Sequence, residues 1–380
     1  MKILIDLVYV RPNNIYSSLS IYAFRIIDTF RQTGRFKEIV LLITPELKEL
    51  CEKKFPEFEY IVYSVPDNFW VKIKYFKLLY AWNYYRKVVN CSGCNGILII
   101  GDLCLYSIFR FKMNKVLIIH DLKSLTDQEN TKFQRFVSKL YYKWQTKNST
   151  RIIAISEYTR QSILKIYRSI KPEKVKTIYN GVVMSSKEQK PLAMPAELKY
   201  ILYVNTLFEY KNILTVLKAF NFIKSNIEHK LVIVGKPTPY WQNELLPYIK
   251  QVKLEDRIIQ MSNLQDSELK YLYIHASLFV TASLHEGFGL TPIEAGICKC
   301  PVVSSRCEAL PDSTMELLFY YDPPYDYEVL GRKMASVLSA PPEMSELEFI
   351  SQKYKDRYDL RKQVEQIYNL FFELACNDKF

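Results

Sequence analysis

The feature that most constrains this chain is a short apolar run that leads through two glycines into the expected start of a helix. Residues 276–282 read Ala-Ser-Leu-Phe-Val-Thr-Ala, which is typical of a buried strand. Gly287 and Gly289 follow and allow loop conformations that other residues rarely adopt. Thr291 is the expected N-cap and Pro292 the expected first residue of a helix. A strand, a glycine loop and a helix N-terminus present backbone N–H groups to an anion such as a phosphate.

Two glutamates bracket this predicted anion site. Glu286 precedes the first glycine, and Glu294 lies in the first turn of the expected helix. An ionised carboxylate only accepts hydrogen bonds and sugar hydroxyls donate them, so the pair suits a hydroxyl-rich ligand. A carboxylate near a helix N-terminus is also favourable by itself, which leaves a purely structural role for Glu294 open.

The stretch Glu-Gly-Phe-Gly-Leu-Thr-Pro-Ile-Glu-Ala, residues 286–295, resembles the E-x7-E signature of the retaining glycosyltransferases of family 4. The flanking residues 269–280 and 300–305 follow the order of the same family. The resemblance implies an α/β chain with the GT-B fold, in which two Rossmann-like domains with parallel sheets face each other across a cleft. It also implies a nucleotide-sugar donor on the second domain and an acceptor on the first.

The resemblance implies a role for each residue of the signature. Glu294 would hold the ribose hydroxyls of the donor, and Glu286 would accept hydrogen bonds from the sugar hydroxyls and fix its pose. The loop residues expected against the donor are Gly287, Phe288, Gly289, Leu290 and Thr291. No side chain is an evident nucleophile or general base. The leaving diphosphate is therefore expected to take the acceptor proton on the same face of the sugar, which gives retention.

Residues 205–212, Asn-Thr-Leu-Phe-Glu-Tyr-Lys-Asn, resemble the family's Gly-Thr-Leu-Glu-Pro-Arg-Lys-Asn element. Lys211 matches the lysine that contacts the diphosphate, where a cation neutralises the leaving group. Tyr210 holds a donor-site position at which the family usually offers an arginine, and Asn205 replaces a glycine. Gly235 ends another apolar strand and is expected beside the base of the donor.

Two further positions lie in the first half of the chain. His120 and Asp121 follow the apolar run 115–119, at the end of a strand where open parallel sheets bind ligands. The resemblance implies that His120 contacts the donor sugar near the reaction centre, and Asp121 would orient the imidazole or contact the acceptor. Ser17 and Ser18 occupy the place of the family's Gly-Gly pair beside the donor phosphates. An ordinary strand-to-helix loop is the alternative there.

A length of 380 residues predicts two domains. Residues 184–198 lack periodicity and carry two prolines, so we interpret them as a linker. The first domain would then span 1–183 and the second 199–353. The family resemblance implies that a last helix, within 354–380, returns to the first domain.

The net charge of +12 is unevenly distributed along the chain. Residues 1–190 carry a net charge of +16, and residues 191–380 a net charge of −4. A basic first half indicates an anionic partner. Because no nucleic-acid-binding motif accompanies the charge, we rank an anionic membrane surface or a lipid-linked acceptor above nucleic acid.

Two helical stretches of this basic half mix aromatic and cationic side chains. Residues 70–87 suit the headgroup region of a bilayer, or else pack their aromatic rings on the first sheet. Residues 132–147 predict a basic helix with an apolar inner face. The side chains expected on that inner face are Phe133, Phe136, Leu140 and Trp144.

The remaining composition bears on compartment and cofactors. The sequence has no apolar run of about 18 residues, the length of a membrane span, and the run 1–10 is too short for a signal peptide. Eight cysteines in a chain this long predict reduced thiols rather than a disulfide framework. We expect a cytoplasmic protein, with peripheral attachment to the inner face of the cell membrane as an option. No Asp-x-Asp pair occurs, so donor binding without a metal or other cofactor is expected.

These features predict a hexosyltransferase that uses a GDP- or UDP-linked sugar and a lipid-linked or polysaccharide acceptor. The resemblance favours cell-surface glycan synthesis, such as O-antigen, lipopolysaccharide or capsule, with mannose or a related sugar. Two alternatives remain open. One is a nucleotide-sugar epimerase of the same fold, which needs no acceptor. The other is a non-catalytic sugar-nucleotide binding module, which the departures at Ser17, Asn205 and Tyr210 favour.

Overall fold

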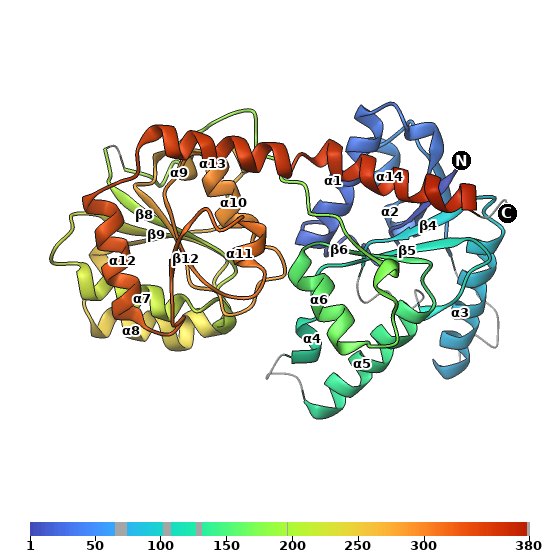
Figure 1. The fold of residues 1–380 in the computed structure, drawn as a ribbon, viewed down its shortest axis with the longest axis horizontal. Helices are drawn as coiled ribbons and strands as arrows, with labels where there is room; N and C mark the ends of the chain where they lie inside the picture. The colour runs from blue at the N-terminus through green and yellow to red at the C-terminus, as the bar shows by residue number, and fades with distance from the viewer. Residues whose placement is uncertain (65–73, 102–107, 127–130, 196, 378–380) are drawn as a thin grey trace. The chain divides into compact units, whose positions relative to one another are not determined.

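The chain forms two compact units, drawn in Figure 1. The first unit comprises Met1–Asn180 and Leu360–Phe380, and the second comprises Gly181–Asp359. Residues 184–198 lie within the second unit, where the Gln189 N–H donates to the Ser267 carbonyl at 3.1 Å. Their role as a linker stays a prediction. The computed structural model describes residues 1–64, 74–101, 108–126, 131–195 and 197–377.

A parallel sheet forms the centre of the first unit. Its described strands are β1 Ile3–Asp6, β2 Ile39–Ile43, β3 Glu59–Val62, β4 Gly96–Ile99, β5 Asn114–Ile119, β6 Arg151–Ala154 and β7 Val175–Thr177. Their order across the sheet is β3-β2-β1-β4-β5-β6-β7. Five of these strands, β1, β2, β4, β5 and β6, are buried along all or nearly all of their length, because helices cover both faces of a doubly wound sheet. This explains why they read as continuous aliphatic runs instead of alternating ones.

Helices surround this sheet. The described ones are α1 Ser18–Gln32, α2 Pro45–Lys54, α3 Lys74–Asn90, α4 Lys123–Thr126, α5 Lys132–Lys147, α6 Glu157–Ile166 and α14 Leu360–Asn377. The last of them, α14, packs against α1 although the two lie at opposite ends of the chain (Figure 1). Gln363 of α14 donates to the Tyr22 hydroxyl of α1 at 2.7 Å. None of the helices in the described part of the chain is long and apolar enough to cross a membrane.

The second unit has a sheet of the same kind. Its described strands are β8 Tyr200–Val204, β9 Lys230–Val234, β10 Ile258–Met261, β11 Leu278–Thr281, β12 Val302–Ser305 and β13 Phe319–Tyr321. The order is β10-β9-β8-β11-β12-β13, and each described strand pairs in parallel with its neighbours. The helices described around it are α7 Ile213–Ile223, α8 Leu246–Gln251, α9 Asp266–His275, α10 Leu290–Ile297, α11 Leu310–Ser313, α12 Tyr327–Ser339 and α13 Met344–Arg357. The expected pair of parallel-sheet, Rossmann-like domains is therefore confirmed.

The C-terminal helix differs from the expectation. The sequence predicts one helix from Tyr354 to Leu374, which is wrong because α13 ends at Arg357 and α14 begins at Leu360. Tyr358 lies at the break and is buried. Its ring meets the Phe288 ring of the same unit edge-on, with the two ring centroids 5.2 Å apart. Neither glycine nor proline marks this break. Tertiary packing of Tyr358 decides it, and helical periodicity cannot reveal it.

In their described residues the two basic stretches form helices α3 and α5, which differ in the side chains that they bury. In α5 the expected inner face is wrong, because Phe133, Phe136, Leu140 and Trp144 are all exposed. In α3, Tyr85 packs inward and is fully buried. Its ring meets the Tyr63 ring edge-on, with the two ring centroids 5.5 Å apart. The side chains of residues 65–79, which carry part of the proposed headgroup-binding segment, lie outside the described residues.

Both strand orders reverse beside the first strand of their sheet. In the first unit the reversal falls between β1 and β4, and in the second between β8 and β11. The loops at the carboxyl ends of strands flanking such a reversal diverge and leave room for a ligand. The residues that sequence analysis singled out lie on these loops or on the loops next to them.

Candidate active site

The site in the second unit is built on the loops that follow β8 and β11. Lys211 ends the short 3₁₀ turn Glu209–Lys211 after β8, and Glu286 lies in the loop after β11. Lys211 Nζ donates to Glu286 Oε1 at 2.6 Å. The two side chains are only 11% and 14% exposed, so water screens the ion pair weakly. The strand order thus joins two residues that lie 75 positions apart in the sequence.

Further hydrogen bonds hold this ion pair in place. Ser283 Oγ donates to the same Glu286 Oε1 at 2.9 Å. The Leu284 N–H donates to the Tyr210 carbonyl at 2.9 Å and ties the two loops together. Because both side-chain donors converge on Oε1, Glu286 Oε2 has no donor among the described residues and can accept a ligand hydroxyl.

Glu308 also belongs to this site, although the sequence marks it only as a weak candidate that follows the signature, without a specific role. Its Oε2 accepts the backbone N–H of Glu286 at 2.8 Å, and its Oε1 lies 3.0 Å from Nδ1 of His285. Glu308 has a backbone φ of +44°, in the left-handed region that residues other than glycine seldom adopt. Its position just after β12, at the same edge of the sheet, is the signal that could have identified it.

The helix after the glycine loop begins earlier than expected. Gly289 is the N-cap of α10 and Leu290 its first residue, so the prediction of Thr291 as N-cap and Pro292 as first residue is wrong. Gly289 has a φ of +85°, and a Cβ there would lie 2.4 Å from Leu310 Cδ2. Both facts require glycine at the cap. A glycine has no side chain that could accept the N–H groups of the first turn, so these donors remain for an anion.

The other loop residues divide between the core and the surface. The Phe288 side chain is buried, so only its backbone can face a ligand. Gly287 and Thr291 are half-buried and Leu290 is exposed. Only part of the predicted donor loop can therefore offer side chains to a donor.

Glu294 lies beyond the first turn of α10, so the prediction that placed it in the first turn is wrong, and a buried tyrosine orients it. The Tyr273 hydroxyl donates to Glu294 Oε2 at 3.0 Å. Burial, and then the charge of Glu294, raise the pKa of the Tyr273 phenol well above its ordinary value. Tyr273 therefore keeps its proton and acts as a fixed donor that orients the carboxylate. Sequence analysis missed Tyr273 because it lies within α9, a helix of mixed polar and apolar residues in which no pattern singles it out.

Tyr210 stands where the resemblance implies an arginine. Its ring centroid lies 5.1 Å from Lys211 Nζ, and the ring stacks on Phe208 with centroids 6.0 Å apart. The ring can attract the ammonium group but has no planar fork of N–H donors. Close packing requires a glycine at position 235 whether or not a ligand binds there, because a Cβ would lie 2.3 Å from the Asn205 carbonyl oxygen.

In the first unit, Ser17 and Ser18 begin helix α1 instead of forming an open loop. Ser17 is the N-cap, and its hydroxyl accepts the Ser20 N–H at 3.3 Å while contacting the Ser20 hydroxyl at 3.0 Å. Ser18 is the first helical residue. A serine cap thus satisfies part of a helix end that a Gly-Gly pair would leave open.

His120 follows β5 and is half-buried. The Tyr22 ring meets its imidazole edge-on, with centroids 4.9 Å apart. Burial lowers the pKa of His120 to about 4, although the nearby charge of Asp121 opposes this shift. His120 is therefore neutral at physiological pH. Asp121 is exposed, and its Oδ1 accepts the backbone N–H of Lys123 at 2.9 Å.

Within the described ranges, no cluster of three or more His, Cys, Asp or Glu side chains could hold a metal ion. Metal independence stays a prediction. Next to the candidate anion site, the described residues supply positive charge through the ammonium group of Lys211 and through the partial positive charge at the N-terminus of α10.

The fold and the candidate site together define the class of protein to which this chain belongs. Two doubly wound parallel sheets carry polar side chains on loops at their carboxyl edges, which is the architecture of GT-B proteins. The chain belongs to glycosyltransferase family 4. The profile described as "Glycosyltransferase Family 4" matches residues 40–185, and the profile described as "Glycosyl transferases group 1" matches residues 184–356.

Individual relatives are more distant. The chain is 29% identical over 196 residues to the O-antigen chain mannosyltransferase RfbU of Salmonella typhimurium, a match that covers 50% of this chain and 52% of RfbU. The match thus spans about half the length of this curated relative.

Among solved structures, sucrose-phosphate synthase from Thermosynechococcus elongatus has a TM-score of 0.76 at 16% identity and covers 99% of this chain and all of its own. Anabaena HepE in complex with UDP and glucose has a TM-score of 0.74 at 16% identity, over 98% of this chain and all of its own. At this identity the likeness concerns the fold.

Proposed function

We propose that this chain is a retaining glycosyltransferase that transfers a hexose from a nucleotide-diphosphate sugar, bound by the second unit. The acceptor would be a lipid-linked or polysaccharide glycan of the cell surface, handled by the first unit in the cytoplasm at the inner face of the membrane. Mannose is the first candidate sugar, because RfbU is named a mannosyltransferase of the O-antigen chain. The HepE structure, which holds UDP and glucose, keeps UDP-glucose among the donors to test.

The observation that carries this proposal is the Lys211–Glu286 pair beside the glycine-capped helix α10. A cation and a row of backbone N–H donors suit a diphosphate. Glu286 Oε2 and Glu294 add acceptors for the hydroxyls of a hexose and a ribose. A nucleotide-sugar combines these three groups in one molecule.

Each donor contact follows from this arrangement. Lys211 and the backbone at Gly289–Thr291 would bind the diphosphate, Glu294 the ribose, and Glu286 the hexose. Gly235 and Tyr210 would lie near the base and the phosphates. Ser17 and Ser18 remain proposed donor contacts from the first unit.

In the proposed reaction, the bond between the anomeric carbon and the diphosphate oxygen breaks while the acceptor oxygen bonds to the same face of that carbon. The acceptor proton passes to the leaving diphosphate, so no side chain is needed as a base. Lys211 stabilises the charge that develops on the diphosphate. We assign neutral His120 a role in turnover and Asp121 a role on the acceptor side.

A thermal-shift panel of GDP- and UDP-sugars, run with and without EDTA, tests donor binding. A ligand that binds the folded state raises the melting temperature by mass action. We expect one donor to raise it, equally with EDTA, and Glu294→Ala to abolish the rise. Lys299→Ala, which removes an exposed ion pair with Glu348, is the control. Absence of a shift with every donor would contradict the proposed donor site.

Product analysis separates the remaining enzymatic alternatives. With the stabilising donor alone, a nucleotide-sugar isomer would identify an epimerase instead of a transferase. With donor and a lipid-linked glycan, a glycosylated product that keeps the anomeric configuration supports the proposal. Donor binding without either product, across a panel of acceptors, would favour a non-catalytic binding module.

A further inference from the structure

Helix α5 of the first unit turns its apolar side outward. Phe133, Phe136 and Trp144 are 73%, 58% and 53% exposed, and Val137 and Leu140 are exposed as well. At 3.6 residues per turn these five side chains fall within an arc of about 100°. They form one continuous stripe, which we call the α5 stripe. Single exposed apolar residues are common on protein surfaces, whereas a contiguous stripe of them indicates an interaction site.

The opposite side of α5, which packs on the unit, is largely polar. Its buried side chains are Tyr142, Gln145 and Thr146. The Thr146 hydroxyl donates to the Tyr142 carbonyl at 2.6 Å. A helix that only had to pack on its own unit would bury its apolar stripe, as α1 does with Phe24, Ile27 and Phe30. The α5 stripe therefore needs another explanation than packing within the unit.

Cations border the stripe along one side. They are Lys132, Arg135, Lys139, Lys143 and Lys147, and no acidic residue occurs between Lys132 and Lys147. Lys147 Nζ lies 5.5 Å from the centroid of the Trp144 ring. An exposed apolar stripe with tryptophan and phenylalanine beside a lysine-rich edge is the composition of helices that lie in the interface of a bilayer.

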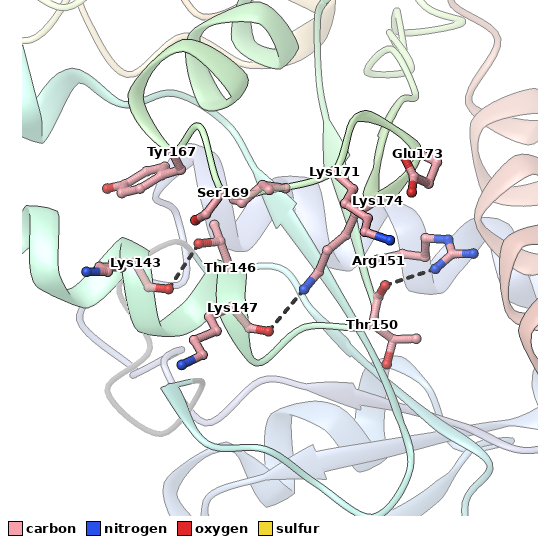
Figure 2. Close-up of a pocket in the computed structure, with 11 residues that line it drawn as sticks. Lys143, Thr146, Lys147, Thr150, Arg151, Tyr167, Ser169, Lys171, Glu173 and Lys174 are labelled. Atoms are coloured by element: carbon pink, nitrogen blue, oxygen red, sulfur yellow. Dashed lines mark hydrogen bonds between the residues drawn. The ribbon is translucent and has the colours of Figure 1, made fainter.

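A basic pocket of about 350 Å³ opens at the C-terminal end of α5 (Figure 2). Its cationic lining residues are Lys143, Lys147, Arg151, Lys171 and Lys174, against one carboxylate, Glu173. Lys174 Nζ donates to the Lys147 carbonyl at 3.0 Å, which fixes one wall of the pocket. A second pocket of about 380 Å³ borders Trp144 and adds Arg86 and Arg110. Arg86 and Arg110 thus share the second pocket with the exposed Trp144, and Lys143 and Lys147 of the first pocket lie on the same helix as this tryptophan.

We propose that this face of the first unit docks on an anionic phospholipid bilayer, with the α5 stripe at the level of the upper acyl chains and the basic pocket against lipid phosphates. The partner follows from charge complementarity. The first half of the chain carries a net charge of +16, so two copies that met through this face would repel each other. A bilayer supplies both an apolar layer and negative headgroups, which the stripe and its basic edge require together.

Docking here would serve the proposed transfer reaction. His120 follows β5 at the carboxyl edge of the sheet, helix α4 comes next, and α4 packs against α5. A glycan whose lipid stays in the bilayer would then reach that edge. This consequence rests on the proposed function, whereas docking itself does not.

The test is co-sedimentation of the full chain with vesicles of phosphatidylglycerol and phosphatidylcholine. We expect binding to anionic vesicles, little binding to pure phosphatidylcholine, and at least a tenfold loss of the partition coefficient in the double variant Phe136→Ser, Trp144→Ser. The matched control is Phe349→Ser, Phe372→Ser, which removes two rings of similar exposure from α13 and α14. Because all four rings are exposed, each variant should keep its thermal unfolding profile.

The outcomes are distinct. Equal vesicle binding by the stripe variant and the control variant would overturn the proposal. So would a chain that ignores vesicles but forms dimers lost in the stripe variant, as measured by light scattering. Inorganic phosphate that displaces the protein more than chloride at equal ionic strength would make the pocket a site for a soluble anion instead. The thermal-shift response to donors is read separately, so failure of docking and failure of the proposed transferase site can be told apart.

Discussion

Lys211 Nζ donates to Glu286 Oε1 at 2.6 Å, and this pair joins the two loops at the strand-order reversal of the second unit. Nearly buried ion pairs of this kind are sensitive to the loss of one partner, because the remaining charge stays without compensation. The pair therefore links the stability of the loops to the proposed binding of the diphosphate.

Lys211→Ala should reduce turnover roughly a hundredfold, since one charged group that stabilises a leaving oxyanion is worth about that much. It should also lower the free energy of unfolding by about 3 kcal/mol, because Glu286 is left nearly buried and unpaired. Steady-state kinetics and urea unfolding measure the two effects. Lys299→Ala, from an exposed pair that water screens, should cost far less. Comparable losses in both variants would show that the Lys211 pair has no special role.

Glu308→Ala should lower kcat about tenfold while the KM for the donor changes little. Glu308 accepts the backbone N–H of Glu286, so its loss should loosen the orientation of that residue without removing a donor contact. Glu308→Gln, which can still accept this hydrogen bond, should recover most of the activity. Glu316→Ala is the control, because Glu316 pairs with Arg306 at the surface. A change in KM alone would instead place Glu308 in direct contact with the donor.

Gly289→Ala should destabilise the protein by about 2 kcal/mol or more, because a left-handed φ is strained for alanine and the Cβ overlaps Leu310. Donor affinity should fall with it, since the N-terminus of α10 would shift. Gly34→Ala is a matched control with a φ of +73° and nothing within 4 Å of its Cβ. Thermal unfolding and donor titration separate the two variants, and equal destabilisation would leave the Leu310 contact without consequence.

The stability of the first unit should depend on pH through His120. The pKa of His120 is about 4 in the folded chain and near 6.5 when unfolded, so the unfolded chain binds the extra proton between these values. Stability should be unaffected by this group above pH 6.5 and should fall as the pH drops toward 4, by about 3 kcal/mol in total. His120→Asn should flatten that part of the profile in urea titrations at stepped pH. An unchanged slope would mean that His120 is not the group responsible.

Much of the fold follows from local sequence. The aliphatic runs 39–43 and 278–281 are buried strands, as their composition predicts, because a parallel sheet covered on both faces demands continuous apolar residues. The two glycines at 287 and 289 do mark a loop before a helix. The family was also recognisable from the residues around this loop.

Other features depend on contacts that no local pattern encodes. Helical periodicity identifies the apolar side of α5, but it does not reveal which side of the helix packs against the rest of the unit. The residues of the exposed stripe were therefore predicted to be buried. The break at Tyr358 arises from its packing against Phe288. The N-cap is Gly289 instead of Thr291, and the left-handed φ and the close contact with Leu310 that favour glycine there are tertiary features.

The sequence by itself determined the two parallel sheets, the glycine loop and the membership of glycosyltransferase family 4, because short local stretches of residues specify or identify each of them. Tertiary structure decided that Lys211 meets Glu286, that Glu308 holds the loop and that Tyr273 orients Glu294. The physical reason is the same in each case. Strand order and helix packing bring distant residues within hydrogen-bond range, and that proximity is a property of the whole fold.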